Sequence, residues 1–299
     1  MEKVTYFGQV GCVRLSNGTV ELVATVDVGP RIIRYGFPGG ENILGELPGV
    51  SIDTPLGPWK PWGGHRLWTA PEANPRSYVP DNDPVEYEAE GERGLRLTQR
   101  VERETGIQKE LFVTLEDEGT RVTIRHVITN RNLWAIEVAP WAITNMKAGG
   151  EAILPQEPYR SWDEYLLPAR PFVLWHYTDL SDPRWTIGPR YLRLKSDERI
   201  ASPQKAGVLN KQGWAAYHLR GTLFIKRFDY EEGASYPDYG SNAEVYTGGS
   251  TIEVETLSPI RRLEPGESAL HTETWELFPN VNLGENEEEI EAAIGELIK

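Results

Sequence analysis

The chain has 299 residues, and 31 Lys and Arg against 45 Asp and Glu give it a formal net charge of −14 at pH 7. This negative charge argues against binding to nucleic acid or to anionic membranes, and no stretch approaches the ~20 apolar residues of a membrane-spanning helix. The single cysteine, Cys12, excludes an internal disulfide and a thiolate metal site, and residues 1–5 lack the apolar core of a signal peptide. We therefore expect a cytoplasmic protein, a monomer or homodimer, with no metal and no cofactor.

Apolar and polar residues alternate with a period of two at residues 20–27, 95–102 and 121–128. This pattern is typical of strands with one face in water, and strands of this kind favour antiparallel sheets. Turn-forming residues separate the segments, for example at residues 16–18 and 116–119. The 10 Trp, 13 Tyr, 29 Gly and 22 Pro also favour short strands and turns over long helices. The sequence predicts an all-β protein.

Residues 62–68 read Trp-Gly-Gly-His-Arg-Leu-Trp, and Glu72 follows shortly afterwards. The glycines allow a tight turn or a close approach to a ligand. Trp68 offers a flat apolar face to the C–H groups of a sugar, while Arg66 and Glu72 can make paired hydrogen bonds to neighbouring hydroxyls. The segment predicts a sugar-binding site, and the structural alternative is a glycine turn beside ordinary strand aromatics.

Residues 161–189 are rich in proline and form the longest stretch without a clear strand pattern, which is typical of functional or disordered loops. Basic residues follow, among them Lys205 and Lys211, each close to a glycine, and Lys226. In an acidic protein such a cluster indicates an anionic ligand such as a sugar phosphate or uronate. The alternative is that these lysines are solvated on strand edges, where they discourage edge pairing.

The strand predicted within residues 251–259 carries two carboxylates. If Ile252 and Val254 face the core, Glu253 and Glu255 share the opposite face, separated by twice the ~3.4 Å rise of a strand. A closing strand follows at residues 269–278, and its His271 is more typical of a structural histidine than of a catalyst.

Asn286 can cap a helix over residues 286–298, because three glutamates in its first turn suit the positive end of the helix dipole. We expect about three turns. Neither a repeat nor a linker divides the sequence, so residues 1–299 are predicted to form a single domain.

The order of these segments resembles the galactose mutarotase-like family, which includes aldose 1-epimerases and hexose-6-phosphate epimerases. The resemblance spans roughly residues 5–280 and rests on Gly-Pro-Arg-Ile-Ile at 29–33, on residues 63–68, and on a carboxylate strand at 255–259. It implies a large antiparallel β-supersandwich. It also implies a glutamate that takes the proton of the anomeric hydroxyl, a histidine that protonates the ring oxygen, and an arginine that holds the sugar. By motif, Glu255 matches the glutamate and Arg66 the arginine.

The sequence departs from this pattern at residues 138–146, which match the strand that should present the acid but contain no histidine. Another histidine, most plausibly His65 or His176, then supplies the proton, and we favour His65 because of its position beside glycines and Arg66. His271 is a further candidate. Alternatively, the protein binds sugars without epimerising them.

Two functions are therefore expected from the sequence: an aldose-1-epimerase-like isomerase acting on an acidic (uronic) or phosphorylated sugar, or a non-catalytic carbohydrate-binding protein on the same scaffold. The predicted catalytic pair is Glu255 and His65. The predicted substrate-binding residues are Arg66, Trp68, Glu72, Lys205, Lys211, Glu244, Tyr246 and His176.

Overall fold

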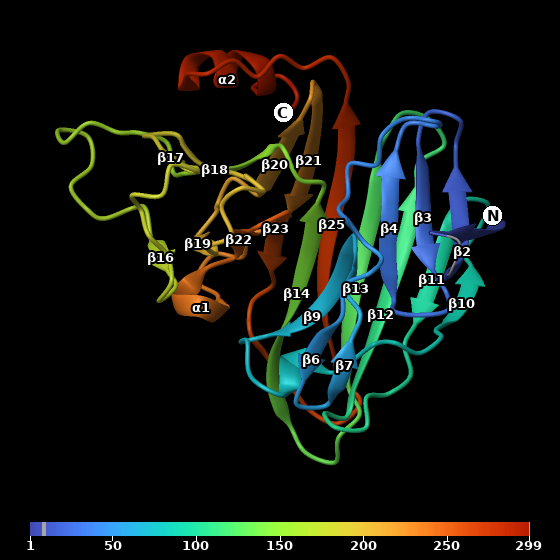
Figure 1. Ribbon diagram of the computed structural model, residues 1–299. Coiled ribbons are helices and arrows are strands. Elements are labelled where there is room, and N and C mark those ends of the chain that lie inside the picture. The colour runs from blue at the N-terminus through green and yellow to red at the C-terminus, as the bar shows by residue number, and fades with distance from the viewer. Residues whose placement is uncertain (8–9, 299) are drawn as a thin grey trace.

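The computed structural model describes residues 1–7 and 10–298. Two large sheets dominate it, and every strand pairing among these residues is antiparallel (Figure 1). The first sheet has 11 strands, in spatial order β1 (Glu2–Tyr6), β2 (Val10–Ser16), β3 (Glu21–Thr25), β4 (Arg31–Gly36), β9 (His65–Ala70), β14 (Ile136–Met146), β23 (Thr251–Leu257), β22 (Ala243–Gly248), β19 (Gln204–Val208) and β16 (Phe172–Leu174), with β24 (Arg261–Leu263) paired to β14.

The second sheet has 10 strands, in the order β10 (Glu86–Ala89), β11 (Gly94–Thr98), β12 (Ile107–Leu115), β13 (Val122–Asn130), β25 (Ser268–Phe278), β21 (Thr222–Phe228), β20 (Trp214–Leu219), β15 (Glu151–Pro155), β18 (Tyr191–Lys195) and β17 (Trp185–Ile187). Two short ribbons pair β5 (Glu46–Leu47) with β8 (Trp62–Gly63) and β6 (Ile52–Thr54) with β7 (Gly57–Trp59). The helical segments are η1 (Arg76–Tyr78), α1 (Pro237–Gly240) and α2 (Glu287–Ile294). The prediction of an antiparallel β-sandwich is confirmed.

The alternating segments of the sequence form β3, β11 and β13, as predicted. Their apolar residues meet between the sheets in one large cluster of buried side chains. Trp275 of β25 lies in this cluster with its ring centre 5.8 Å from that of Tyr35 in β4 and 5.5 Å from that of Phe224 in β21. Burial of such large rings is the main favourable contribution to folding here.

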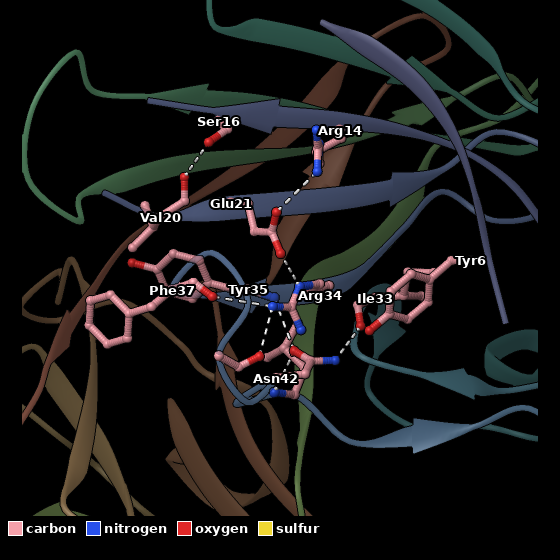
Figure 2. A network of polar contacts seen from close by, with 12 residues as sticks. Tyr6, Arg14, Ser16, Val20, Glu21, Ile33, Arg34, Tyr35, Phe37 and Asn42 are labelled. Carbon is pink, nitrogen blue, oxygen red and sulfur yellow. Dashed lines mark hydrogen bonds and ion pairs between the residues drawn. The ribbon is translucent and has the colours of Figure 1, made fainter. Parts of the chain in front are cut away.

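The first sheet is also held by polar contacts at its N-terminal edge (Figure 2). Arg34 of β4 donates through Nε to Glu21 Oε1 of β3 at 2.7 Å and through a terminal nitrogen to the Gly40 carbonyl at 3.0 Å. Arg14 of β2 reaches the other oxygen of Glu21 at 3.4 Å. Glu21 therefore links three neighbouring strands.

Helix α2 begins where the sequence predicts, because the Asn286 side chain accepts hydrogen bonds from the backbone of Glu288 and Glu289 in a capping box. It is shorter than predicted. The helix has 8 residues and ends at Ile294, before Gly295, so it makes about two turns. Ile290 and Ile294 pack on β15, β18, β20 and β21 in a second apolar cluster.

Residues 157–184, called the arm below, link β15 to β17 and project from the sandwich at the left of Figure 1. Apart from β16, the arm is irregular, as its proline content predicts. Several large apolar side chains on it are exposed, including Trp162 at 78% and Leu166 at 72%. Among the residues described, no helix has the length and apolar character needed to span a bilayer.

Candidate functional site

A cavity of about 550 Å³, called the cleft below, lies on the face of the first sheet that points away from the second sheet. In β9, Arg66 and Trp68 line the cleft, whereas Leu67 between them packs in the core. In β23, the alternate residues Glu253 and Glu255 line it in the same way. The prediction that these two carboxylates share one face is confirmed.

Cross-strand register assembles the site from five strands. One row of neighbouring residues runs from Arg66 (β9) through Ile143 (β14) and Glu255 (β23) to Glu244 (β22). The next row runs from Asn145 (β14) through Glu253 (β23) and Tyr246 (β22) to Lys205 (β19). Because opposite residues of an antiparallel pair have Cβ atoms about 4.5–5.5 Å apart, neighbours in a row can contact each other.

The two glycines before β9 allow a close approach between backbones. Gly63 has a φ of 87°, and a Cβ there would lie 2.2 Å from the Gly45 carbonyl oxygen. Gly64 has a φ of 67°, and its Cβ would lie 2.1 Å from the Ile32 carbonyl oxygen. A side chain at Gly64 would therefore push the start of β9 away from β4, and one at Gly63 would collide with the backbone of Gly45.

Aromatic rings form the walls of the cleft. Trp68 packs against three of them, with its ring centre 5.2 Å from Trp59, 5.0 Å from Tyr78 and 5.6 Å from Trp141. The other aromatic residues that line the cleft are Trp175 and Tyr177 from the arm and Tyr246 from β22. Flat apolar faces beside a few polar groups are what sugar recognition requires.

Arg66 is already paired within the protein. Its guanidinium lies over Trp68 at 4.8 Å and over Trp59 at 5.3 Å from the ring centres. It also donates to Glu253 Oε1 at 3.1 Å, with both side chains largely buried. These contacts fix the guanidinium and neutralise its charge.

Lys205 is more deeply enclosed. Its ammonium lies 4.7 Å from the ring centre of Trp141 and 4.8 Å from that of Trp175, and 2.9 Å from one oxygen each of Glu244 and Glu255. Burial lowers the pKa of Lys205, but the two carboxylates outweigh burial and hold the pKa well above its ordinary value. Lys205 is therefore held as an ammonium ion between two glutamates.

Glu255 has one engaged and one available oxygen. Oε2 accepts hydrogen bonds from Lys205 Nζ at 2.9 Å and from Trp141 Nε1 at 2.8 Å. Oε1 is buried and has no hydrogen-bond partner among the described residues. A buried carboxylate oxygen without a partner is costly, so a hydroxyl group that enters the cleft and donates to Oε1 would remove that cost.

Glu244 lies behind Lys205 and has no exposed surface. Its carboxylate lies 2.9 Å from the Lys205 ammonium, and this cation opposes the rise in pKa that burial and the charges of Glu255 and Asp238 would otherwise cause. Gly207 faces Glu244 across the strands, and a Cβ there would lie 2.4 Å from Ser241 Oγ. The glycine makes room for the side chains packed beside Glu244.

The structure brings many of the predicted site residues together. Those that line the cleft are Arg66, Trp68, Glu72, Lys205, Tyr246 and Glu255. Glu244 supports Lys205 from below without lining the cleft. His176 is exposed and does not line the cleft, although its neighbours Trp175 and Tyr177 do. Lys211 lies beyond the end of β19 and lines a different cavity.

The expectation that His65 faces the ligand needs correction. His65 has no exposed surface and lies on the core side of β9, because strand alternation places it opposite Arg66. Its Nδ1 is 2.9 Å from Thr144 Oγ1, its Nε2 is 2.6 Å from His126 Nε2, and its ring centre is 4.8 Å from that of Trp275. His271 is also buried between the sheets, at 6% exposure.

His65, His126 and Glu273 offer ligand atoms within 4.8 Å of one another, a grouping that could hold a metal ion. The ammonium group of Lys226 already lies beside this cluster. Lys226 Nζ lies 2.8 Å from Glu273 Oε1 and 2.7 Å from Thr144 Oγ1. Burial lowers the pKa of His65 well below its ordinary value, so the histidine stays neutral beside this cation. A divalent ion added here would leave uncompensated charge in the core.

Sequence reasoning missed several cleft residues. Trp59 ends the three-residue strand β7, Tyr78 lies in η1, and Trp175 and Tyr177 lie in irregular chain, so no extended strand pattern indicates their orientation. Asn145 could have been found, because it has the same strand parity as Trp141 in β14, and both line the cleft. Its Nδ2 lies 3.5 Å from Glu253 Oε1.

No protein-family model matches the sequence, and no curated protein matches it. Solved structures do match the fold. A galactose mutarotase-like protein from Lactobacillus casei superposes with a TM-score of 0.56 at 11% identity, covering 90% of this chain and 100% of the other. A galactose mutarotase-like protein from Clostridium acetobutylicum gives 0.51 at 11% identity, covering 93% and 98%.

A third structure, a TPR-domain containing protein from Parabacteroides distasonis, gives a TM-score of 0.59 at 15% identity and covers 93% of this chain but 49% of its own. The same sandwich is therefore also found as part of a longer protein. At these identities the similarity concerns the architecture. The chain has the galactose mutarotase-like fold predicted from its sequence.

Proposed function

We propose that the cleft binds a sugar and interconverts its anomers, with Glu255 as the general base. The observation that carries the proposal is the arrangement at Glu255: Oε1 has no hydrogen-bond partner in the described part of the chain, while Oε2 lies 2.9 Å from the Lys205 ammonium. A hydroxyl and a ring oxygen attached to the same carbon can contact such a carboxylate and ammonium together. The proposal rests on this geometry within an aromatic cleft.

The reaction would proceed by opening of the ring. Glu255 Oε1 takes the proton from the anomeric hydroxyl while Lys205 Nζ donates a proton to the ring oxygen. The bond between the anomeric carbon and the ring oxygen breaks, and its electron pair stays on that oxygen as the carbonyl forms. After rotation of the aldehyde, the ring recloses on the other face and both protons return. Lys205 thus takes the place of the expected histidine acid.

The charges in the cleft favour an uncharged sugar over a phosphate or uronate. The lining residues include two cations, Arg66 and Lys205, and three carboxylates, Glu72, Glu253 and Glu255. Both cations are already within 4 Å of carboxylates. An anionic substituent would meet a net negative charge and would have to displace existing ion pairs.

A second candidate, a carbohydrate-binding protein without catalysis, is favoured by one feature of the same residues. The raised pKa of Lys205 makes it a weak proton donor, and no histidine lines the cleft among the described residues. On this account the cleft keeps its aromatic walls and its Glu255 contact but does not move protons.

A two-stage experiment separates the candidates. A thermal-shift screen of neutral aldoses, uronates and hexose phosphates identifies a ligand, since a ligand at 100 times its Kd stabilises by about 2.7 kcal/mol. Anomer exchange of that sugar is then followed by NMR with and without protein. Exchange faster than in buffer supports the isomerase. Saturable binding with exchange at the buffer rate would retire it and leave the binding protein.

A further inference from the structure

A second large cavity, of about 670 Å³, lies within the arm and is called the arm pocket below. The segment 157–171 supplies most of its walls, and Leu209 and Lys211, which follow β19, complete them. No residue lines both the arm pocket and the cleft. Its volume lies in the range of about 300–1,000 Å³ that is usual for small-molecule sites.

The lining of the arm pocket is cationic in an otherwise acidic protein. Arg160, Arg170 and Lys211 line it, against the single carboxylate of Glu157. None of these three cations forms an ion pair within residues 1–7 and 10–298. The formal charge of the lining is therefore 3 − 1 = +2, whereas the chain carries −14.

The contacts of these side chains position them without neutralising them. Arg170 is half-buried and donates through Nε to the backbone carbonyl of Glu157 at 3.0 Å. The Arg160 guanidinium lies 5.6 Å from the ring centre of Tyr165, which also lines the pocket. The Lys211 ammonium lies 5.9 Å from the ring centre of Tyr230. Stacking on rings orients a cation while leaving its N–H groups available.

Glu164 lies in the same segment but does not line the arm pocket, and it is already engaged. Glu164 accepts hydrogen bonds from the backbone and hydroxyl of Ser161 at 2.9 and 3.1 Å. These bonds lower the pKa of Glu164, and the charge of Arg160 contributes only in addition. Glu164 therefore completes its own turn and forms no ion pair with Arg160 among the described residues.

We propose that the arm pocket binds the phosphate group of a small phosphate monoester. A phosphate monoester carries about −1.5 to −2 charges at neutral pH, which matches the +2 lining better than a single carboxylate does. Two guanidinium groups offer the paired N–H donors that phosphate oxygens prefer. The rings of Tyr159 and Tyr165 and neighbouring prolines supply apolar surface for the esterified group. This site is independent of the sugar function proposed for the cleft.

The probe is phenyl phosphate, titrated into the full chain by calorimetry at low salt, with benzoate as the singly charged comparison. We expect saturable binding of phenyl phosphate, tighter than that of benzoate. R170M, at the half-buried guanidinium, should weaken binding by about tenfold. K211M, at an exposed position, should weaken it by about threefold.

Two matched variants locate the effect. K195M removes an exposed lysine outside both cavities and should leave the phenyl phosphate affinity unchanged, and so should E255Q in the cleft. Absence of saturable binding to the wild-type chain, equal losses in K195M and R170M, or a loss in E255Q would each overturn the proposal. So would binding of a phosphotyrosine peptide without binding of phenyl phosphate, because the site would then belong to a protein partner.

Discussion

The cleft and the arm pocket are both lined by cationic side chains, but the groups that contact these cations differ between the two cavities. In the cleft, Arg66 and Lys205 project from paired strands, and each contacts carboxylates and indole rings. In the arm pocket, Arg160 and Lys211 project from irregular chain, lie beside tyrosine rings and form no ion pair within the described part of the chain. The charge that a ligand meets is therefore decided by pairing and not by residue type.

Burial explains the difference. Lys205 is 5% exposed, and an unpaired ammonium at such a position would lose its hydration without compensation. The adjacent strands β22 and β23 each supply a glutamate to meet it. Lys211 remains in contact with water, so it needs no partner.

The largest effect is expected when Lys205 is removed. K205M would leave Glu244 and Glu255 buried side by side without their counter-ion, and breaking a buried pair in this way costs about 3–5 kcal/mol of unfolding free energy. K211M, the matched change in the arm pocket, should stay within about 0.5 kcal/mol of wild type. Urea unfolding measures both. Equal stability of the two variants would contradict the contrast.

The next effect concerns catalysis in the cleft. If the cleft exchanges anomers, E255Q should slow exchange by about 10²–10⁴-fold, because the amide keeps the shape of the side chain but cannot accept the proton. Sugar affinity should change little. E157Q removes a carboxylate from the arm pocket and should exchange anomers at the wild-type rate. A full rate in E255Q, followed by NMR or polarimetry, would exclude Glu255 as the base.

Lowering the pH should reduce the folding stability through the buried histidines beneath the cleft. No histidine lines the arm pocket. Burial lowers the pKa of His271 to about 3, and it lowers that of His65 as well. Between pH 6.5 and 5 the unfolded chain binds protons at these histidines and the folded protein does not, so stability falls as pH falls. The loss is about 2 kcal/mol per histidine over 1.5 pH units.

Urea midpoints at pH 7.5 and 5.0 measure this loss. The depressed pKa of Glu273 acts in the same direction, but only at lower pH. H176N, which changes an exposed histidine of the arm, should keep the full pH dependence. An unchanged midpoint between the two pH values would show that the buried histidines are not neutral in the folded protein.

The smallest effect separates two tryptophans of the arm. Trp175 lines the cleft, whereas Trp162 is 78% exposed and lines neither cavity. W175A should weaken sugar binding by about two- to tenfold, the effect of losing one aromatic contact. W162A should leave sugar binding unchanged. Sugar affinity is measured by calorimetry. Equal affinities of the two variants would show that Trp175 does not contact the sugar.

The sandwich could be predicted from the sequence because it rests on local patterns. Alternation located β3, β11 and β13, and the same alternation placed Glu253 and Glu255 on one face. A resemblance in the order of motifs was sufficient to recognise the galactose mutarotase-like fold, although identity to the solved structures is as low as 11%.

The errors at the site have identifiable causes. His65 and Arg66 are adjacent in one strand, so they cannot face the same side, and the parity rule could have excluded His65. Lys205 and Lys211 have equal parity, but β19 ends at Val208, and the chain then turns away from the cleft. The pairing of Lys205 with Glu244 and Glu255 depends on contacts between strands distant in sequence, which one sequence does not reveal.

The cations of the cleft are paired with carboxylates and those of the arm pocket are not, within the described residues, so the salt dependence of ligand binding should differ between the two cavities. Calorimetric titrations of the sugar ligand and of phenyl phosphate into one preparation would be run at about 0.01 M and 1 M ionic strength, where the Debye length falls from about 30 to 3 Å. We predict an unchanged Kd for the sugar and a clearly weaker Kd for phenyl phosphate at high salt. A sugar affinity that falls with salt while phosphate binding does not would contradict the account.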